Sequence, residues 1–184
     1  MTTYSYIDIL NILNILNKKA GNTRRLAVLG VGSTLRADDG AGVYVVERLI
    51  KIFSRENCPG LIFCPGETAP ENFSGTIRNF RPDHILVFDA ADFGKTPGEV
   101  IEIAPACTVG PTFCSHTLPL RLMLNYLADE TGAEVTLLGI QYQNLEFDRE
   151  MTPAVKMSAD SLAAAVETFI RARWHIFSAQ ENST

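Results

Sequence analysis

The sequence predicts a single-domain α/β protein of three layers, α/β/α, with a mostly parallel, twisted sheet of five strands. Short apolar runs bounded by Gly or Pro alternate with segments of helical period, a pattern typical of parallel sheets with crossover helices. The chain has 184 residues, enough for one domain with a sizeable core. One alternating segment, 99–103, follows the preceding strand too closely for a crossover helix of about a dozen residues, which predicts an antiparallel edge strand.

The first predicted unit runs from Leu26 to Leu49 and contains a strand, a glycine turn, a loop and a helix. The strand is the apolar run 26–29, which is closed by Gly30 and Gly32. The helix is predicted from apolar residues that share one face at helical spacing: Val43, Val46, Leu49, Ile50 and Phe53.

The remaining elements are predicted in alternation along the chain. Strands are expected at 61–64, where Pro65-Gly66 ends the run, and at 85–88, 99–103 and 135–140. Helices are expected at 69–80, 118–130 and 155–174. The segments before and after this domain, residues 26–176, are predicted to be a helical extension at 1–25, packed on the domain or on a partner, and a flexible tail at 177–184.

Composition excludes several classes of function. The net charge is -5 with no basic block, which argues against a nucleic-acid partner. No apolar run approaches the ~18 residues of a membrane-spanning helix, and the N-terminus lacks the features of a signal peptide. The four cysteines form no C-x-x-C pair, which argues against a zinc knuckle, and we expect them to be reduced thiols. We expect a cytoplasmic protein without membrane insertion, and we favour a monomer.

The loop after the first strand carries two adjacent carboxylates, Asp38 and Asp39. A dinucleotide fingerprint needs a third glycine where this chain has Leu35, and a phosphate-binding P-loop needs Gly-Lys-Ser/Thr where it has Asp-Asp-Gly. The pattern instead suggests a site for a cation or a polar backbone. The alternative is that one of these aspartates only caps the following helix.

Three residues are expected to meet at the carboxyl edge of the sheet: Asp39, Asp89 and His116. Asp39 follows the first strand, Asp89 ends the third, and His116 ends a loop before a helix. In an open α/β sheet this edge is where ligands bind. Two carboxylates and an imidazole make a plausible open site for a first-row transition metal, although each residue also has an ordinary structural explanation.

The chain resembles the maturation endopeptidases of nickel-iron hydrogenases, and among them the hydrogenase 3 type. The resemblance spans roughly Leu26 to Ala165 and is carried by GVGSTLRADDGAGVYVVERL, GETAPEN, IRNFRPDHILVFDAADFGKTPGEV, SHTLPL and VTLLGIQ. Two positions depart from the family pattern: Ser33 stands where Asn is usual, and Tyr142 where close relatives have Pro.

The resemblance implies an endopeptidase that removes a C-terminal peptide from the large-subunit precursor of the hydrogenase after nickel insertion. Asp39, Asp89 and His116 match the family's metal-binding and catalytic positions. Nickel would arrive on the substrate, so that the isolated protein holds it weakly or not at all. The resemblance also implies a substrate-binding role for Gly66, Glu67 and Thr68. We expect Asp38 to bind substrate, to support the metal-binding residues from behind, or to act as a base.

Two other classes of function stay open at this point. One is a nickel-handling or metal-sensing protein that uses the same Asp/Asp/His site without catalysis. The other is a nucleotide-binding α/β module, which the two failed phosphate motifs disfavour.

Overall fold

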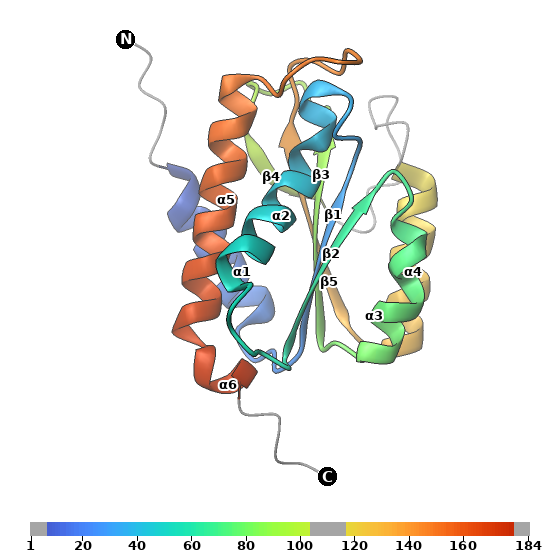
Figure 1. Ribbon diagram of the computed structural model, residues 1–184, viewed down its shortest axis with the longest axis vertical. Helices are drawn as coiled ribbons and strands as arrows, with labels where there is room; N and C mark the ends of the chain where they lie inside the picture. The colour runs from blue at the N-terminus through green and yellow to red at the C-terminus, as the bar shows by residue number, and fades with distance from the viewer. Residues whose placement is uncertain (1–6, 104–116, 179–184) are drawn as a thin grey trace.

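The computed structural model describes residues 7–103 and 117–178, and within them one five-stranded sheet forms the centre of the protein (Figure 1). The strand order is β2-β1-β3-β5-β4, and only the pair of β4 and β5 is antiparallel. This confirms the predicted fold class. The strands are β1 (Leu26–Val31), β2 (Leu61–Glu67), β3 (His84–Ala91), β4 (Val100–Ile103) and β5 (Glu134–Gln141).

Helices cover both faces of this sheet. Figure 1 shows α1, α2 and α5 on one face and α3 with α4 on the other. The α-helices are α1 (Ile7–Ala20), α2 (Ala41–Phe53), α3 (Ser74–Phe80), α4 (Thr117–Thr131), α5 (Pro153–Ala172) and α6 (Trp174–Ser178). Two 3-10 helices precede α2 and α3: η1 (Ala37–Gly40) and η2 (Pro70–Phe73).

The alternation of side chains along the strands builds two hydrophobic cores. In β1, Leu26 and Val28 pack under α1, α2 and α5, whereas Ala27 and Leu29 pack under α3 and α4. Successive side chains of a strand point to opposite faces, so each apolar strand supplies both layers. This two-sided burial explains why the central strands read as continuous apolar runs.

The second strand is longer than predicted. We expected Pro65-Gly66 to end it, but β2 continues to Glu67. Proline cannot donate a hydrogen bond to a neighbouring strand, which is harmless at the edge of a sheet, and β2 is an edge strand. The register of β1 and β2 shifts between Gly30 and Val31, so the irregularity falls beside this proline.

Two further boundaries differ from the prediction. The third strand extends to Ala91, so Asp89 lies inside β3 rather than after it. The helix expected over 69–80 is divided into η2 and α3, and Pro70 starts the 3-10 turn.

Both terminal helices pack against the domain. Ile12 and Leu16 of α1 are buried in the first core, and α1 lies along α5. Phe177 of α6 is also fully buried, and its carbonyl accepts a hydrogen bond from Gly60 N–H over 2.9 Å. Residues 177 and 178 therefore belong to the packed body and not to the tail that we predicted from residue 177.

None of the helices in the described part of the chain has the length and apolar character needed to cross a membrane.

Candidate functional site

The first carboxylate of the candidate site, Asp39, is held in the 3-10 turn η1 at the carboxyl edge of the sheet. Its Oδ2 accepts a hydrogen bond from Ser33 N–H over 2.9 Å, and only 6% of the residue is exposed. Gly32 makes this approach possible: its φ is +119°, and a Cβ there would lie 1.7 Å from the Asp39 carbonyl oxygen. The absence of a side chain at Gly32 thus allows the backbone of Asp39 to pack against the end of β1.

The second carboxylate, Asp89, is buried in the central strand β3 with 3% of its surface exposed. Burial and, to a smaller extent, the negative charge of Asp39 raise the pKa of Asp89 to about 7, against the opposing effect of a hydrogen bond from Ala90 N–H. The charge of Asp39 acts on Asp89 because the two side chains lie within electrostatic range. The structure therefore brings together two of the three predicted site residues.

The third predicted residue, His116, lies outside the described residues. α4, which begins at the next residue, covers the face of the sheet on which Val87 and Ala91 are buried. Asp89 alternates with Phe88 in β3 and therefore falls on that same side. Within the residues that the structure describes, no group of three side chains has the composition and spacing of a metal site.

Asp38 has a structural role that its contacts show directly, while its part in substrate binding stays a prediction. Its carboxylate is fully buried and accepts four hydrogen bonds. Its Oδ1 accepts the bond from Thr152 N–H over 2.6 Å, and its Oδ2 accepts bonds from Gln143 N–H, Asn144 N–H and the Thr152 hydroxyl over 2.9, 2.9 and 3.0 Å. It does not cap α2, because no side chain caps η1 or α2. Asp38 instead fixes the loop 142–152 and the start of α5.

We predict that Asp38→Asn lowers the free energy of unfolding by about 2–4 kcal/mol, because either orientation of the amide turns its NH2 group toward backbone N–H donors that lose their acceptor. Thr152→Val removes only the hydroxyl bond and should cost about 1 kcal/mol. Urea unfolding monitored by circular dichroism measures both values. Equal stability of Asp38→Asn and wild type would contradict the anchoring role.

The predicted substrate loop also reaches the carboxyl edge. Gly66 is buried, and a Cβ there would lie 2.9 Å from Leu29 Cδ1 and 3.0 Å from the Gly30 carbonyl oxygen. Glu67 and Thr68 are exposed, and the Glu67 carbonyl accepts a hydrogen bond from Gly32 N–H over 2.9 Å. Gly66 thus packs the end of β2, while the next two side chains are free to meet a ligand.

Backbone strain gathers around this edge. Four non-glycine residues in the described chain have a positive φ, and three of them lie at this edge. Glu67 is the last residue of β2, and Ala37 and Asp148 lie in the segments that follow β1 and β5. Conformations of this kind cost energy in residues other than glycine and concentrate at functional sites. Their position agrees with a site at the ends of β1, β2 and β5.

Sequence analysis missed one polar side chain that organises the site. Gln141, at the end of β5, is 5% exposed; its Oε1 accepts hydrogen bonds from Phe93 N–H and Lys95 N–H over 2.7 and 3.2 Å. Its Nε2 donates to Asp92 Oδ1 over 3.1 Å. Gln141 therefore fixes the loop that follows β3, the strand that carries Asp89. The signal available in the sequence was a glutamine at the end of an otherwise apolar run.

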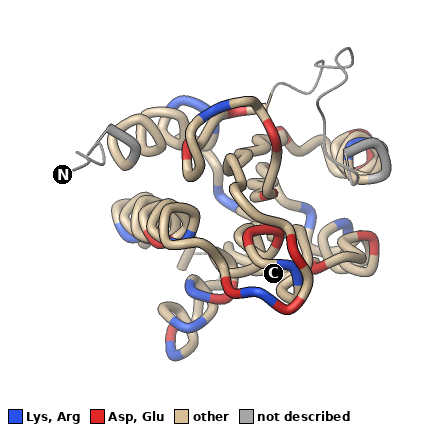
Figure 2. The backbone as a smooth tube through the Cα atoms, turned by 90° about the horizontal axis from the view of Figure 1, so that it is seen from above, with Lys and Arg blue, Asp and Glu red and all other residues tan. Residues whose placement is uncertain are grey.

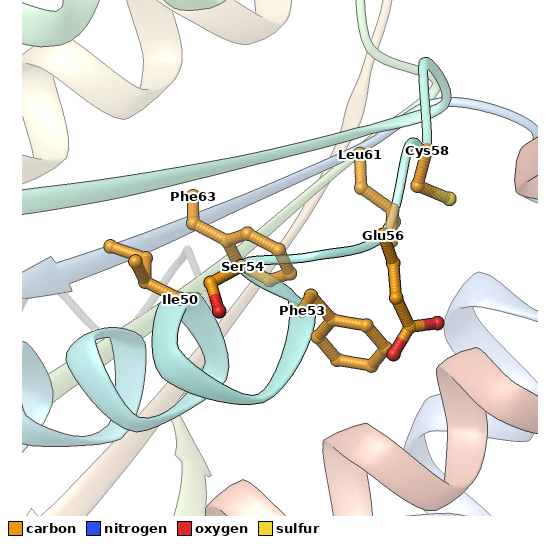
Figure 3. A pocket seen from close by; sticks show the side chains of 7 residues that line it. All are labelled: Ile50, Phe53, Ser54, Glu56, Cys58, Leu61 and Phe63. Atoms are coloured by element: carbon orange, nitrogen blue, oxygen red, sulfur yellow. The ribbon is translucent and has the colours of Figure 1, made fainter.

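A separate pocket of about 350 Å³ lies at the opposite, amino edge of the sheet (Figure 3). The rings of Phe53 and Phe63 stack there with centroids 5.8 Å apart. Burial raises the pKa of Cys58 in this pocket to about 11 and that of Cys64, in β2, to about 12. Both thiols stay neutral at pH 7 and are not activated nucleophiles. Cys107 and Cys114 lie outside the described residues.

Comparison with known proteins gives a consistent result. Residues 43–169 match the family model described as hydrogenase maturation protease. A putative hydrogenase maturation protease of Methanocaldococcus jannaschii is 34% identical over 152 residues, which are 80% of this chain and 89% of the relative. The hydrogenase 3 maturation protease of Escherichia coli K12 is 32% identical over 142 residues, 76% of this chain and 87% of the relative.

Solved structures agree in fold. The crystal structure of a [NiFe] hydrogenase maturation protease, HycI, from Thermococcus kodakarensis superposes with a TM-score of 0.78 at 30% identity, covering 85% of this chain and 99% of that one. The solution structure of the endopeptidase HycI from Escherichia coli gives a TM-score of 0.66 at 32% identity, covering 79% and 90%. This protein belongs to the hydrogenase maturation protease family.

Proposed function

We propose that this protein is the endopeptidase that removes the C-terminal peptide from a nickel-iron hydrogenase large-subunit precursor after nickel insertion. Asp39, Asp89 and His116 are the residues that recognise the nickel, which is part of the substrate and not a resident cofactor. The reaction takes place in the cytoplasm, before the hydrogenase is assembled. Membership of the maturation protease family supports the reaction, and the carboxylate pair supports the recognition of a cation.

The single observation that carries the proposal is the burial of Asp89 beside Asp39. A buried carboxylate next to a second negative charge weakens the folded state, and the core of an ordinary α/β domain has no need of one. Such costs are typical of positions that are kept for chemistry. A cation brought to this edge by the substrate relieves the repulsion and favours the ionised form of both side chains.

The donor set also fits nickel on a substrate better than a permanently bound ion. Two carboxylates and an imidazole leave coordination positions open, and the thiolates of the precursor supply the softer ligands that nickel accepts. With its pKa raised to about 7, Asp89 holds its proton at neutral pH far more readily than an ordinary carboxyl group does. It releases this proton when a cation approaches, which makes recognition dependent on pH and weak in the free protein.

The test is a cleavage assay read by mass spectrometry. The purified protein is mixed with the cognate large-subunit precursor, either loaded with nickel or free of it. Loss of one defined C-terminal peptide from the loaded form alone supports the proposal in full. Cleavage of both forms would keep the peptidase and refute the nickel recognition.

An intact precursor in every mixture would refute the peptidase. In that case isothermal titration with nickel decides the alternative, because a nickel-handling protein must bind the ion tightly without any precursor. A substitution provides an independent check: if Asp89→Ala cleaves nickel-loaded precursor at the wild-type rate, the assigned site is wrong.

A further inference from the structure

Two loops at the carboxyl edge of the sheet are joined into one rigid unit, which we call the loop clamp (residues 33–39 and 142–152). Asp38 supplies its centre through the four hydrogen bonds described above, and Asp38 N–H adds a fifth, to the Asn144 carbonyl, over 3.1 Å. Further out, Arg36 Nε donates to the Leu145 carbonyl over 3.2 Å, and Asp148 N–H donates to the Leu35 carbonyl over 2.9 Å.

Two large apolar side chains of the loop clamp are exposed to solvent. Leu35 is 62% exposed and Phe147 is 69% exposed, and their backbones are adjacent because Asp148 N–H bonds to the Leu35 carbonyl. A single exposed apolar residue is common on protein surfaces, but two on hydrogen-bonded neighbouring loops are a candidate contact surface. Because the loops are already fixed, a partner that covers them needs to order little of this protein.

The surroundings of this pair resemble the rim of a protein interface. Arg36, Asp148 and Glu150 of the loop clamp are exposed. Arg149 and Glu146 are exposed too and form an ion pair over 3.3 Å. Figure 2 looks onto this edge from above and shows acidic and basic residues alternating over the surface loops. An apolar centre within a polar, charged border is the usual anatomy of a protein-binding surface.

We propose that Leu35 and Phe147 form a docking patch for an apolar segment of the protein substrate, next to the peptide bond that is cut. This inference rests on the proposed function, because it takes the occupant to be the hydrogenase precursor. The loop that carries Leu35 also carries Asp39, four residues later, so a short stretch of one fixed loop joins the docking patch to the carboxylate pair. The rigid attachment through Asp38 sets the distance between the docking patch and the carboxylates.

The test compares steady-state cleavage by wild type, by the double variant Leu35→Ser/Phe147→Ser and by the control Leu122→Ser. Leu122 is as exposed as Leu35, at 62%, but lies on α4, away from the loop clamp. We expect kcat/KM of the double variant to fall about 30-fold, almost entirely through KM, because two central apolar contacts are lost. The control should match wild type, and all three melting temperatures should agree within about 2 °C.

A second measurement separates this proposal from the proposed function. Binding of the nickel-free precursor, which the proposed function leaves uncleaved, is measured with wild type, the double variant and the control, each with Asp89 intact. If the double variant binds more weakly while wild type and the control bind equally well, the result supports the docking patch. This holds even if wild type cleaves nothing and the peptidase assignment fails. Equal binding and an unchanged KM would overturn the docking patch. A wild-type dimer that the double variant converts to a monomer, with KM unchanged, would overturn it too and would assign the surface to a second copy.

Discussion

Replacing Asp89 with asparagine is expected to reduce cleavage of the hydrogenase precursor at least about a hundredfold and, at the same time, to make the folded protein more stable above pH 7. On the proposed function, activity is lost because the amide carries no charge with which to meet the nickel of the substrate. Stability is gained because the amide has nearly the same shape but does not ionise in a buried position beside Asp39. Opposite effects on activity and stability distinguish a functional residue from a structural one.

The gain has a defined pH range. Because the pKa of Asp89 rises from 3.8 to about 7 on folding, the folded state favours the protonated form. The stabilisation from that proton is complete below about pH 4 and is lost as the pH rises through 7. Relative to wild type, Asp89→Asn should therefore gain nothing at pH 4 and on the order of 4 kcal/mol above pH 8.

Denaturant unfolding at a series of pH values, in the presence of a chelator, measures this difference. Asp92→Asn is the matched control. The pKa of Asp92 is lowered by hydrogen bonds from Gly94 N–H and the Gln141 amide, so its contribution to stability is present at high pH and is lost on acidification. That variant should show no gain at pH 8. A flat difference between Asp89→Asn and wild type across the pH range would contradict the raised pKa.

The sequence predicted the fold well because local patterns and chain topology agree. Apolar runs separated by helical segments require a parallel sheet, and the short link before Val100 rules out a crossover there. The end of β2 was misplaced because proline is read as a strand breaker, although an edge strand tolerates it. Whether a strand is at an edge depends on the order of the sheet, which local patterns do not contain.

The site was predicted only in part, for a physical reason. Asp39 and Asp89 were found because both follow or end apolar strands at one edge of the sheet. The structural role of Asp38 was not predicted, because its partners, Gln143, Asn144 and Thr152, lie more than a hundred residues away and donate mainly through backbone N–H groups. Backbone N–H groups are present in every residue except proline. The sequence therefore does not show which loop will donate hydrogen bonds to a distant carboxylate.

A glycine brings the two site carboxylates together, and we predict that Gly42→Ala lowers the free energy of unfolding by about 3 kcal/mol or more. A Cβ at Gly42 would lie 2.3 Å from the Phe88 carbonyl oxygen and 2.6 Å from the Val31 carbonyl oxygen, and both atoms belong to strand backbones. Neither strand can move away, because β1 and β3 are central and buried on both faces. The start of α2 must therefore move off the sheet.

The consequence extends to the chemistry, because Gly42 follows the turn that carries Asp39 and touches the carbonyl just before Asp89. Moving α2 away from β3 separates the carboxylates, so cleavage should fall even at temperatures where the variant remains folded. Gly75→Ala is the matched control: it lies in α3 with no atom within 4 Å of the new Cβ, and it should stabilise by about 0.5–1 kcal/mol. If both alanine variants unfold at the same denaturant concentration, the contact of Gly42 with β1 and β3 does not determine how closely α2 packs on the sheet.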